Sequence, residues 1–209
     1  MTKKEYIEKV KVKLDEVSPF EEPLTFIAAD GDSSYDKVKP ITKYIEEELD
    51  NAARYCLSVL PLSLLTNDIK SGVASLTITN GVGAALCRSN MRLCRVKAAD
   101  WERDVTHFFT SEDAEYLVQQ NKHTRSGVAK PSVFFIPERD EIELYSFPIN
   151  SQTDSVTIWS IDTYTKAENV VSNISDFIVL KCAQLVLDIL GNTNSALMEK
   201  EFERKVSAL

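Results

Sequence analysis

The sequence has few of the residues on which most enzyme and cofactor sites depend. Only two of its 209 residues are histidine, and only six are glycine. It has no Walker-type Gly-Lys-Ser/Thr, and Gly81-Val-Gly83 lacks the third glycine of a dinucleotide-binding fingerprint because Leu86 stands there. We therefore expect no nucleotide site, and Asn80-Gly81 instead predicts a tight turn between strands.

Cysteine is also sparse, and no apolar run is long enough for a membrane helix. The four cysteines are Cys56, Cys87, Cys94 and Cys182. None form a Cys-x-x-Cys pair, which argues against a zinc site, and buried reduced thiols are the simplest interpretation. No apolar stretch approaches the roughly 20 residues of a membrane span, and Met1–Val10 lacks the core of a signal peptide. We expect a protein kept in the cytosol, or in a particle assembled there, with no cofactor and no membrane contact.

Acidic residues outnumber basic ones, and the excess is uneven along the chain. There are 24 Lys and Arg against 32 Asp and Glu, a formal net charge of −8, which argues against general coating of nucleic acid. Residues 1–80 carry net −4, residues 81–136 net +2 and residues 137–209 net −6. A basic middle between acidic ends fits subunits that pair through complementary faces, and it also fits ordinary surface scatter.

Apolar spacing predicts helices at both ends of the chain. Residues 6–17 and 39–60 repeat apolar side chains every three or four positions. Residues 174–190 are apolar on nearly every side, which is typical of a buried helix, so Leu185→Asp is expected to collapse the fold. Gly191 should end that helix, and an amphipathic helix follows it.

The middle of the chain has the alternating pattern of strands. A short helix is expected over residues 112–120, and residues 21–39 have the composition of a loop. Strands are expected at residues 76–79, 91–96, 105–109, 132–136, 142–146 and 155–161. The expected fold class is α+β, a helical bundle formed by the N- and C-terminal helices with a small β-rich insertion. Residues 1–70 and 170–209 would form the bundle, and residues 71–169 the insertion.

A few side chains could carry chemistry, and each has a structural explanation as well. Glu141 and Glu143 share a face of the expected strand and could act as an acid–base pair or hold a metal. They fit a solvated hairpin face equally well. His107 lies in an apolar stretch and fits a strand residue. A small intracellular hydrolase that uses Glu141, Glu143 or His123 is the alternative to a structural protein.

Two segments are candidates for contacts with other proteins. Lys122, Arg125 and Lys130 lie in a basic loop that could contact phosphates or an acidic partner. Arg125→Glu is therefore expected to leave the monomer folded and to weaken assembly. Trp101 and Arg103 are typical of an interface, or of a core edge where an arginine covers an indole.

Several segments, in order along the chain, match the pattern of one family. They are Tyr44–Arg54 running into Leu60–Leu65, Arg92–Arg103, Asn121–Gly127 with Lys130-Pro131, Glu143–Ser146, and Asp176–Ala196. Together they resemble the ring, or adaptor, proteins in the head-to-tail connector of tailed bacteriophages. The resemblance is closest to the ring proteins of crAss-like phages.

The resemblance implies a non-enzymatic virion protein that assembles in the cytoplasm of the bacterial host. It implies a ring, usually of twelve copies, that lies beneath the portal and extends the DNA channel to the tail. The partners would be the portal protein, neighbouring copies and the next tail or ring protein, with genomic DNA only passing through. By position, the segment Glu199–Leu209, which includes Phe202, would wrap around and contact the portal. A tail-tube or stopper protein of the same particle is a further alternative.

Overall fold

The computed structural model describes residues 1–17, 40–121, 123–125, 127, 130–148 and 151–209. The chain divides into two compact units, a helical unit of Met1–Asn67 with Thr163–Leu209 and a sheet unit of Asp68–Asp162. The loop expected over residues 21–39 lies outside the described residues. None of the helices in the described ranges has the length and apolar character needed to cross a membrane.

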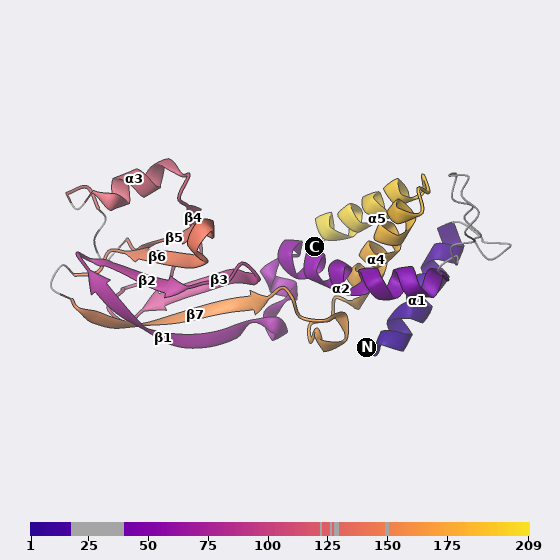
Figure 1. Ribbon diagram of the computed structural model, residues 1–209, viewed down its shortest axis with the longest axis horizontal. Helices are drawn as coiled ribbons and strands as arrows, with labels where there is room; N and C mark the ends of the chain where they lie inside the picture. Colours follow the sequence, from indigo (N-terminus) through magenta and orange to yellow (C-terminus); the bar gives the residue numbers. More distant parts are fainter. Residues whose placement is uncertain (18–39, 122, 126, 128–129, 149–150) are drawn as a thin grey trace, which may run out of the picture. The chain divides into compact units, whose positions relative to one another are not determined.

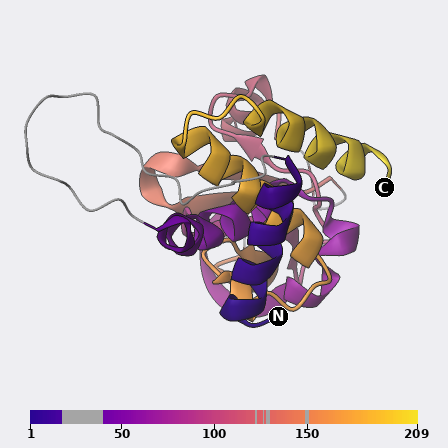
Figure 2. The ribbon, with the colours of Figure 1, turned by 90° about the vertical axis from the view of Figure 1, so that its right-hand side faces the viewer.

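The helical unit is built around one central helix. Its helices are α1 (Lys3–Val17), α2 (Ile41–Val59), α4 (Ser175–Ile189) and α5 (Ser195–Ser207). Helix α4 packs against each of the other three (Figures 1 and 2). Short 3₁₀ turns cover Leu62–Leu64, Thr66–Asp68 and Ala167–Asn169, and a further one, Pro137–Arg139, lies in the sheet unit. The structure thus confirms the helices that apolar spacing predicts at both ends of the chain.

Local sequence signals fix the ends of two of these helices. Thr2 and Glu5 cap α1 reciprocally, since the Thr2 N–H donates to Glu5 Oε2 at 2.8 Å and the Glu5 N–H donates to Thr2 Oγ1 at 3.3 Å. Gly191 follows α4 with φ +64°, and the Asn192 N–H donates to the Leu187 carbonyl at 2.9 Å. This left-handed cap confirms the predicted end of the buried helix.

The sheet unit contains seven strands in the order β3-β7-β1-β2-β6-β5-β4. They are β1 (Lys70–Thr79), β2 (Val82–Leu86), β3 (Met91–Ala98), β4 (Phe109–Thr110), β5 (Ser132–Ile136), β6 (Glu141–Tyr145) and β7 (Thr153–Asp162). Only β4 and β5 are parallel among these neighbours. Helix α3 (Ala114–Gln120) connects β4 to the segment before β5. The expected strand over residues 105–109 is reduced to a single Val96–Val105 bridge and the two residues of β4.

The turn between β1 and β2 is the one that the sequence predicts. Asn80 and Gly81 have φ of 54° and 76°, and Thr79 pairs with Val82 across them. Positive φ at both central residues is the hairpin geometry that Asn-Gly favours. Beyond this turn β2 pairs with β6 over its whole length, whereas most of β1 pairs with β7.

The core of the sheet unit lies against one face of the curled sheet. Trp101 packs against Phe147 there with the two rings tilted and their centroids 5.4 Å apart. A smaller cluster of Phe134, Ile136 and Tyr145 packs with Tyr116. The larger cluster also contains Leu76, Ile78, Val96, Ala98, Val133, Ile142, Leu144, Val156 and Ile158.

The expectation of a helical bundle with a small β-rich insertion is wrong. The seven strands form one mixed sheet curled into a half-barrel, so the chain is a sheet-rich α+β protein. Strand β2 reads Val-Gly-Ala-Ala-Leu and has a single β-branched residue. The first six residues of β1 read Lys-Ser-Gly-Val-Ala-Ser and show no apolar alternation. These segments form strands because they pair with β6 and β7. Their own residues have little strand propensity and do not predict a strand.

Candidate protein-interaction surface

Strands β3 and β7 have one face of half-buried side chains that are partly exposed to solvent. Residues directly opposite each other in antiparallel strands share a face. Val96 and Ile158 are opposite each other and lie in the core. Their neighbours Arg95 and Trp159 are also paired, and they lie on the outer face because successive side chains alternate.

An arginine–tryptophan stack lies at the centre of this outer face. The Arg95 guanidinium carbon is 3.8 Å from the centroid of the Trp159 ring. Asp104 holds the arginine in place, with Arg95 Nη1 3.2 Å and Lys97 Nζ 3.9 Å from its two carboxylate oxygens. Arg92 pairs with Ile161 and so lies on the same face. We call Arg92, Arg95, Lys97 and Trp159 the Arg–Trp surface.

The Arg–Trp surface combines cations, an indole and partial exposure. The Arg95 and Lys97 side chains are 43 % and 30 % exposed. Partial burial lowers the pKa of Arg92 below its ordinary value, yet an arginine stays charged in proteins. Arginine and tryptophan are the side chains most often found at energetically dominant contacts between proteins. Asp104 offsets one of the three positive charges of Arg92, Arg95 and Lys97, and the remaining net +2 can bind an acidic partner surface.

The structure separates the predicted pair Trp101 and Arg103. Trp101 is 2 % exposed and stacks in the core of the sheet unit, whereas Arg103 is exposed in the segment after β3. The aromatic–arginine contact of this region is formed by Arg95 and Trp159 instead. The sequence contains one signal for this contact. Strand alternation places Trp159 on the face opposite Val156, so that Trp159 is predicted to lie on the outer face when Val156 is in the core.

Arg125 lies in the predicted basic loop, and its guanidinium contacts backbone atoms of its own chain. Its Nε donates to the Gln119 carbonyl at 2.8 Å and its Nη2 to the Gln120 carbonyl at 3.4 Å. Its Nη1 donates to the carbonyl of Asn80, in the turn after β1. Lys130 is exposed, and Lys122 lies outside the described residues.

The carboxylate of Glu143 is held by two tyrosines. The Tyr116 and Tyr145 hydroxyls donate to Glu143 Oε2 at 3.0 and 2.6 Å. Burial, reinforced by these hydrogen bonds, raises the pKa of both tyrosines. Arg139 Nη1 is 3.7 Å from the other Glu143 oxygen. Glu143 thus joins α3 to β6, and Glu141 lies one position before the buried Ile142 on the same strand.

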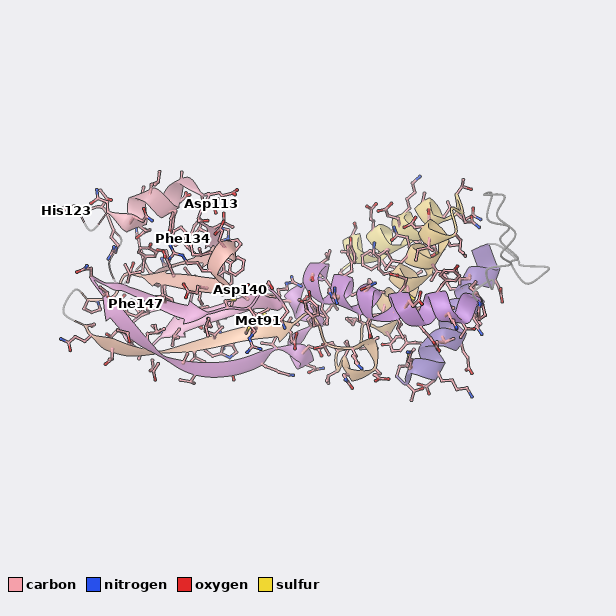
Figure 3. All side chains as sticks on the ribbon, in the orientation of Figure 1. Met91, Asp113, His123, Phe134, Asp140 and Phe147 are labelled. Carbon is pink, nitrogen blue, oxygen red and sulfur yellow. The ribbon has the colours of Figure 1, made fainter. Side chains whose placement is uncertain are left out.

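His123 and the acidic turn before β6 are not brought together, and His107 contacts an aromatic ring. His107 is exposed, and its ring lies edge-on to Phe109 with centroids 4.8 Å apart. The His123 N–H donates to Asn121 Oδ1 at 3.0 Å. Figure 3 shows His123 well separated from Asp140 within the sheet unit.

All four cysteines are buried. Burial raises the pKa of Cys56 and of Cys182 to about 12, and that of Cys87 to about 11. Burial is also the main cause of the raised pKa of Cys94. Thiols with such values are poor nucleophiles at neutral pH because little thiolate forms. Within the described ranges, no three histidine, cysteine, aspartate or glutamate residues lie close enough together to hold a metal ion.

Of the three candidate contact residues in the C-terminal segment, one is buried and two are exposed. Phe202 is 5 % exposed and contacts the rings of Tyr55 and Phe177, each with centroids 5.8 Å away. Glu199 is exposed, and Leu209 is 64 % exposed. Phe202 therefore attaches α5 to the helical unit, and Glu199 and Leu209 are the members that a partner could reach.

Comparison with known proteins finds no family model that matches the chain and no matching curated protein. The functional proposal therefore depends on the residue patterns and on the surfaces described above.

Proposed function

We propose that the chain is a structural protein of a tailed-bacteriophage particle, assembled in the host cytoplasm. It forms a ring adaptor in the head-to-tail connector, beneath the portal, and extends the DNA channel to the tail. The Arg–Trp surface is the observation that carries the proposal, because it gives the sheet unit a face suited to an acidic neighbour. The five segments that resemble connector ring proteins support the same function.

The charges of the two units suggest which faces of neighbouring copies meet. The sequence of the helical unit has 14 basic and 19 acidic residues, a net charge of −5. The sheet unit has 10 basic and 13 acidic residues, net −3, but eight of the basic residues fall in segment 81–136, which carries net +2 and includes β3. Contact between the Arg–Trp surface of one copy and the helical unit of the next is a head-to-tail interface, which forms a ring when the rotation between copies closes.

The overall acidic character suits a channel through which DNA moves. A net charge of −8 repels phosphates at long range. DNA could therefore pass without being retained, while the basic residues of the Arg–Trp surface are taken up by contacts between copies. The exposed Glu199 on α5 and the exposed Leu209, which follows α5, are the parts of the helical unit that we assign to the portal.

The decisive experiment mixes the purified protein with portal rings from the same genome. Light scattering on size-exclusion peaks should show co-elution at about one copy per portal subunit. Co-elution with a tail component in place of the portal would identify a tail-tube or stopper protein instead. A monomer that ignores both would overturn the proposal and direct attention to a hydrolase screen around Glu143.

A pair of charge-neutralising variants tests the assigned face. Arg95→Gln removes the cation that stacks on Trp159, and we expect assembly to weaken by at least about tenfold, as at other arginine contacts of this kind. Arg139→Gln removes one charge from an exposed turn of the same unit and should assemble like the wild type. Equal assembly by the two variants would place the interface elsewhere.

A further inference from the structure

Strand β1 has no neighbouring strand along most of one of its two edges. Lys70–Thr77 pair with β7 in unbroken register, but only Ile78 and Thr79 pair with β2. In Figure 1 the first half of β1 runs along the border of the sheet. The edge that faces away from β7 is therefore open over several residues.

The hydrogen-bond pattern tells which residues face the open edge. The Ile78 N–H donates to the Gln152 carbonyl at 2.9 Å, on the β7 side. In an antiparallel pair, alternate residues direct both backbone groups toward the same neighbour. Ser71, Val73 and Ser75 therefore direct N–H and C=O away from β7. Among the described residues, no backbone hydrogen bond is found for these outward groups.

The two edges of the β3-β7-β1 strands differ in how they are protected. The β3 edge has a register shift between Leu93 and Arg95, and Val96 makes a bridge to Val105. Bulges and charged side chains are the devices that keep edge strands from pairing. The open part of β1 has one charge, at Lys70, and otherwise Ser, Gly, Val, Ala and Ser. Val73 is 75 % exposed, so this edge is unprotected.

A groove of about 410 Å³ runs along this part of β1. Five consecutive residues, Lys70–Ala74, line it, together with Arg88, Met91 and Ile158. Because Ile158 lies on β7 and Met91 on β3, the groove lies on one face of the three strands, and β1 forms the side of it that has the open edge. A Cβ added at Gly72 would meet no heavy atom within 4 Å, so the groove has free space at that position.

We propose that the open edge of β1 binds an extended segment of a partner polypeptide, which adds a strand beside β1 and directs an acidic side chain to Lys70 and Arg88. The main-chain groups of Ser71, Val73 and Ser75 supply the pairing, as in other cases of strand addition. A side chain of the segment can enter the free space at Gly72, which lies opposite Ile158 of β7. This inference does not depend on the proposed ring.

Charge complementarity selects an acidic segment over a basic one. Lys70 and Arg88 are the cations of the groove, and Asp162 is its one carboxylate among the described lining residues. That carboxylate accepts a hydrogen bond from Asn90 Nδ2 at 3.0 Å. The groove therefore offers two cations to an incoming carboxylate, against one carboxylate already engaged with the protein.

The test uses a fluorescein-labelled hexapeptide of alternating threonine and valine that ends in glutamate. We expect saturable binding to the full chain by fluorescence anisotropy. The same peptide with N-methyl groups on the amides of one edge should bind at least about tenfold more weakly, since N-methylation removes the donors that pair with β1. Replacing the glutamate by lysine should also weaken binding.

Three variants locate the binding on the protein. Val73→Pro removes an outward N–H that β7 does not use, and proline is tolerated at strand edges, so the fold should persist while peptide binding is lost. Val73→Thr keeps the N–H and the β-branch and should bind like the wild type. Gly72→Leu fills the groove and should abolish binding even if Val73→Pro fails to fold.

Two results would overturn the proposal. One is no binding of the hexapeptide to the wild type, or equal binding by the N-methylated peptide. The other is self-association of the wild type that Val73→Pro converts to monomer, because the edge would then pair with a second copy of this chain. Failure to co-elute with portal rings would leave the peptide result untouched, so this inference and the ring proposal fail separately.

Discussion

The Arg125 guanidinium ties the end of α3 to the turn between β1 and β2. It donates to three backbone carbonyls, of Gln119, Gln120 and Asn80, and its carbon lies 5.1 Å from the Tyr145 ring centroid. Hydrogen bonds from charged donors contribute more than neutral ones. This geometry revises the expectation that Arg125→Glu would spare the monomer, because a carboxylate at this position would face carbonyl oxygens.

We expect Arg125→Ala to lower the free energy of unfolding of the sheet unit by about 1–3 kcal/mol, since three carbonyls lose a charged donor. Urea denaturation followed by tryptophan fluorescence measures this, because both tryptophans, Trp101 and Trp159, lie in that unit. Lys130→Ala removes an exposed cation nearby and should change the free energy by less than about 0.5 kcal/mol. Equal effects of the two variants would contradict a structural role for Arg125.

Buried thiols make the helical unit sensitive to alkali. The pKa of Cys56 and of Cys182 is about 12 in the fold, against about 8.5 in an unfolded chain. Below pH about 8.5 both states keep the protons, so the thiols do not change stability. Between that pH and about 12 only the unfolded state loses them, so stability falls as pH rises, by up to about 1.4 kcal/mol per pH unit per thiol.

The measurement is urea denaturation followed by far-ultraviolet circular dichroism at pH 8 and pH 10. The wild type should lose stability between the two values, and Cys56→Ala should lose less because one of the two thiols is gone. A slope that Cys56→Ala leaves unchanged would assign the alkaline loss to other groups, such as Tyr6, whose pKa burial raises to about 12.

The other three helices of the helical unit all pack against α4. Leu187 is fully buried on it, whereas Ile189, two residues further on, is 52 % exposed. We expect Leu187→Ala to cost about 2–5 kcal/mol, since removing a buried leucine leaves a cavity, and Ile189→Ala to cost under about 1 kcal/mol. Thermal and urea denaturation give both values.

The same burial pattern changes the expectation for Leu185→Asp. Leu185 is only partly buried, so an aspartate there can reach water. Collapse is expected for Leu187→Asp instead, because an unpaired charge would be fully enclosed. A folded Leu187→Asp protein would show that α4 is less central than its contacts indicate.

Helices and β-branched strands of this chain could be predicted, and the rest of the sheet could not. The spacing in α2 and the all-round apolar character of α4 are strong local signals. Strands β5 and β7 are rich in aromatic and β-branched residues, which mark them equally well. Strand β2 and most of β1 are strands through their pairing partners, and a local pattern carries no information about those.

The Arg–Trp surface could be predicted only in part, because local sequence patterns do not show which strands are neighbours. Trp101 and Arg103 are neighbours in sequence, but the tryptophan turns into the core. The contact between Arg95 and Trp159 joins two strands that are far apart along the chain and become neighbours only in the sheet. Alternation could place Trp159 on the face opposite Val156, but register between distant strands is a tertiary property, so its contact with Arg95 could be found only in the structure.

The uneven distribution of charge gives a prediction for the whole molecule. If copies associate through the Arg–Trp surface and the net −5 helical unit, salt should weaken the association. The screening length falls from about 14 Å near 50 mM salt to about 4 Å near 500 mM. Sedimentation velocity across this range should show assemblies shrinking, whereas an assembly held by apolar contacts would persist or grow.

The helical unit is discontinuous in the chain, and this has a consequence for its synthesis on the ribosome. Helices α1 and α2 are made early, but their main partner α4 is made only after the whole of Asp68–Asp162. The sheet unit is continuous and can fold during translation, since domains generally fold as units as they emerge. The apolar faces of α1 and α2 must meanwhile stay uncovered for the time that the ribosome takes to add these residues. Nascent chains stalled after Asp162 should therefore bind a chaperone such as trigger factor, and release it once α4 has emerged.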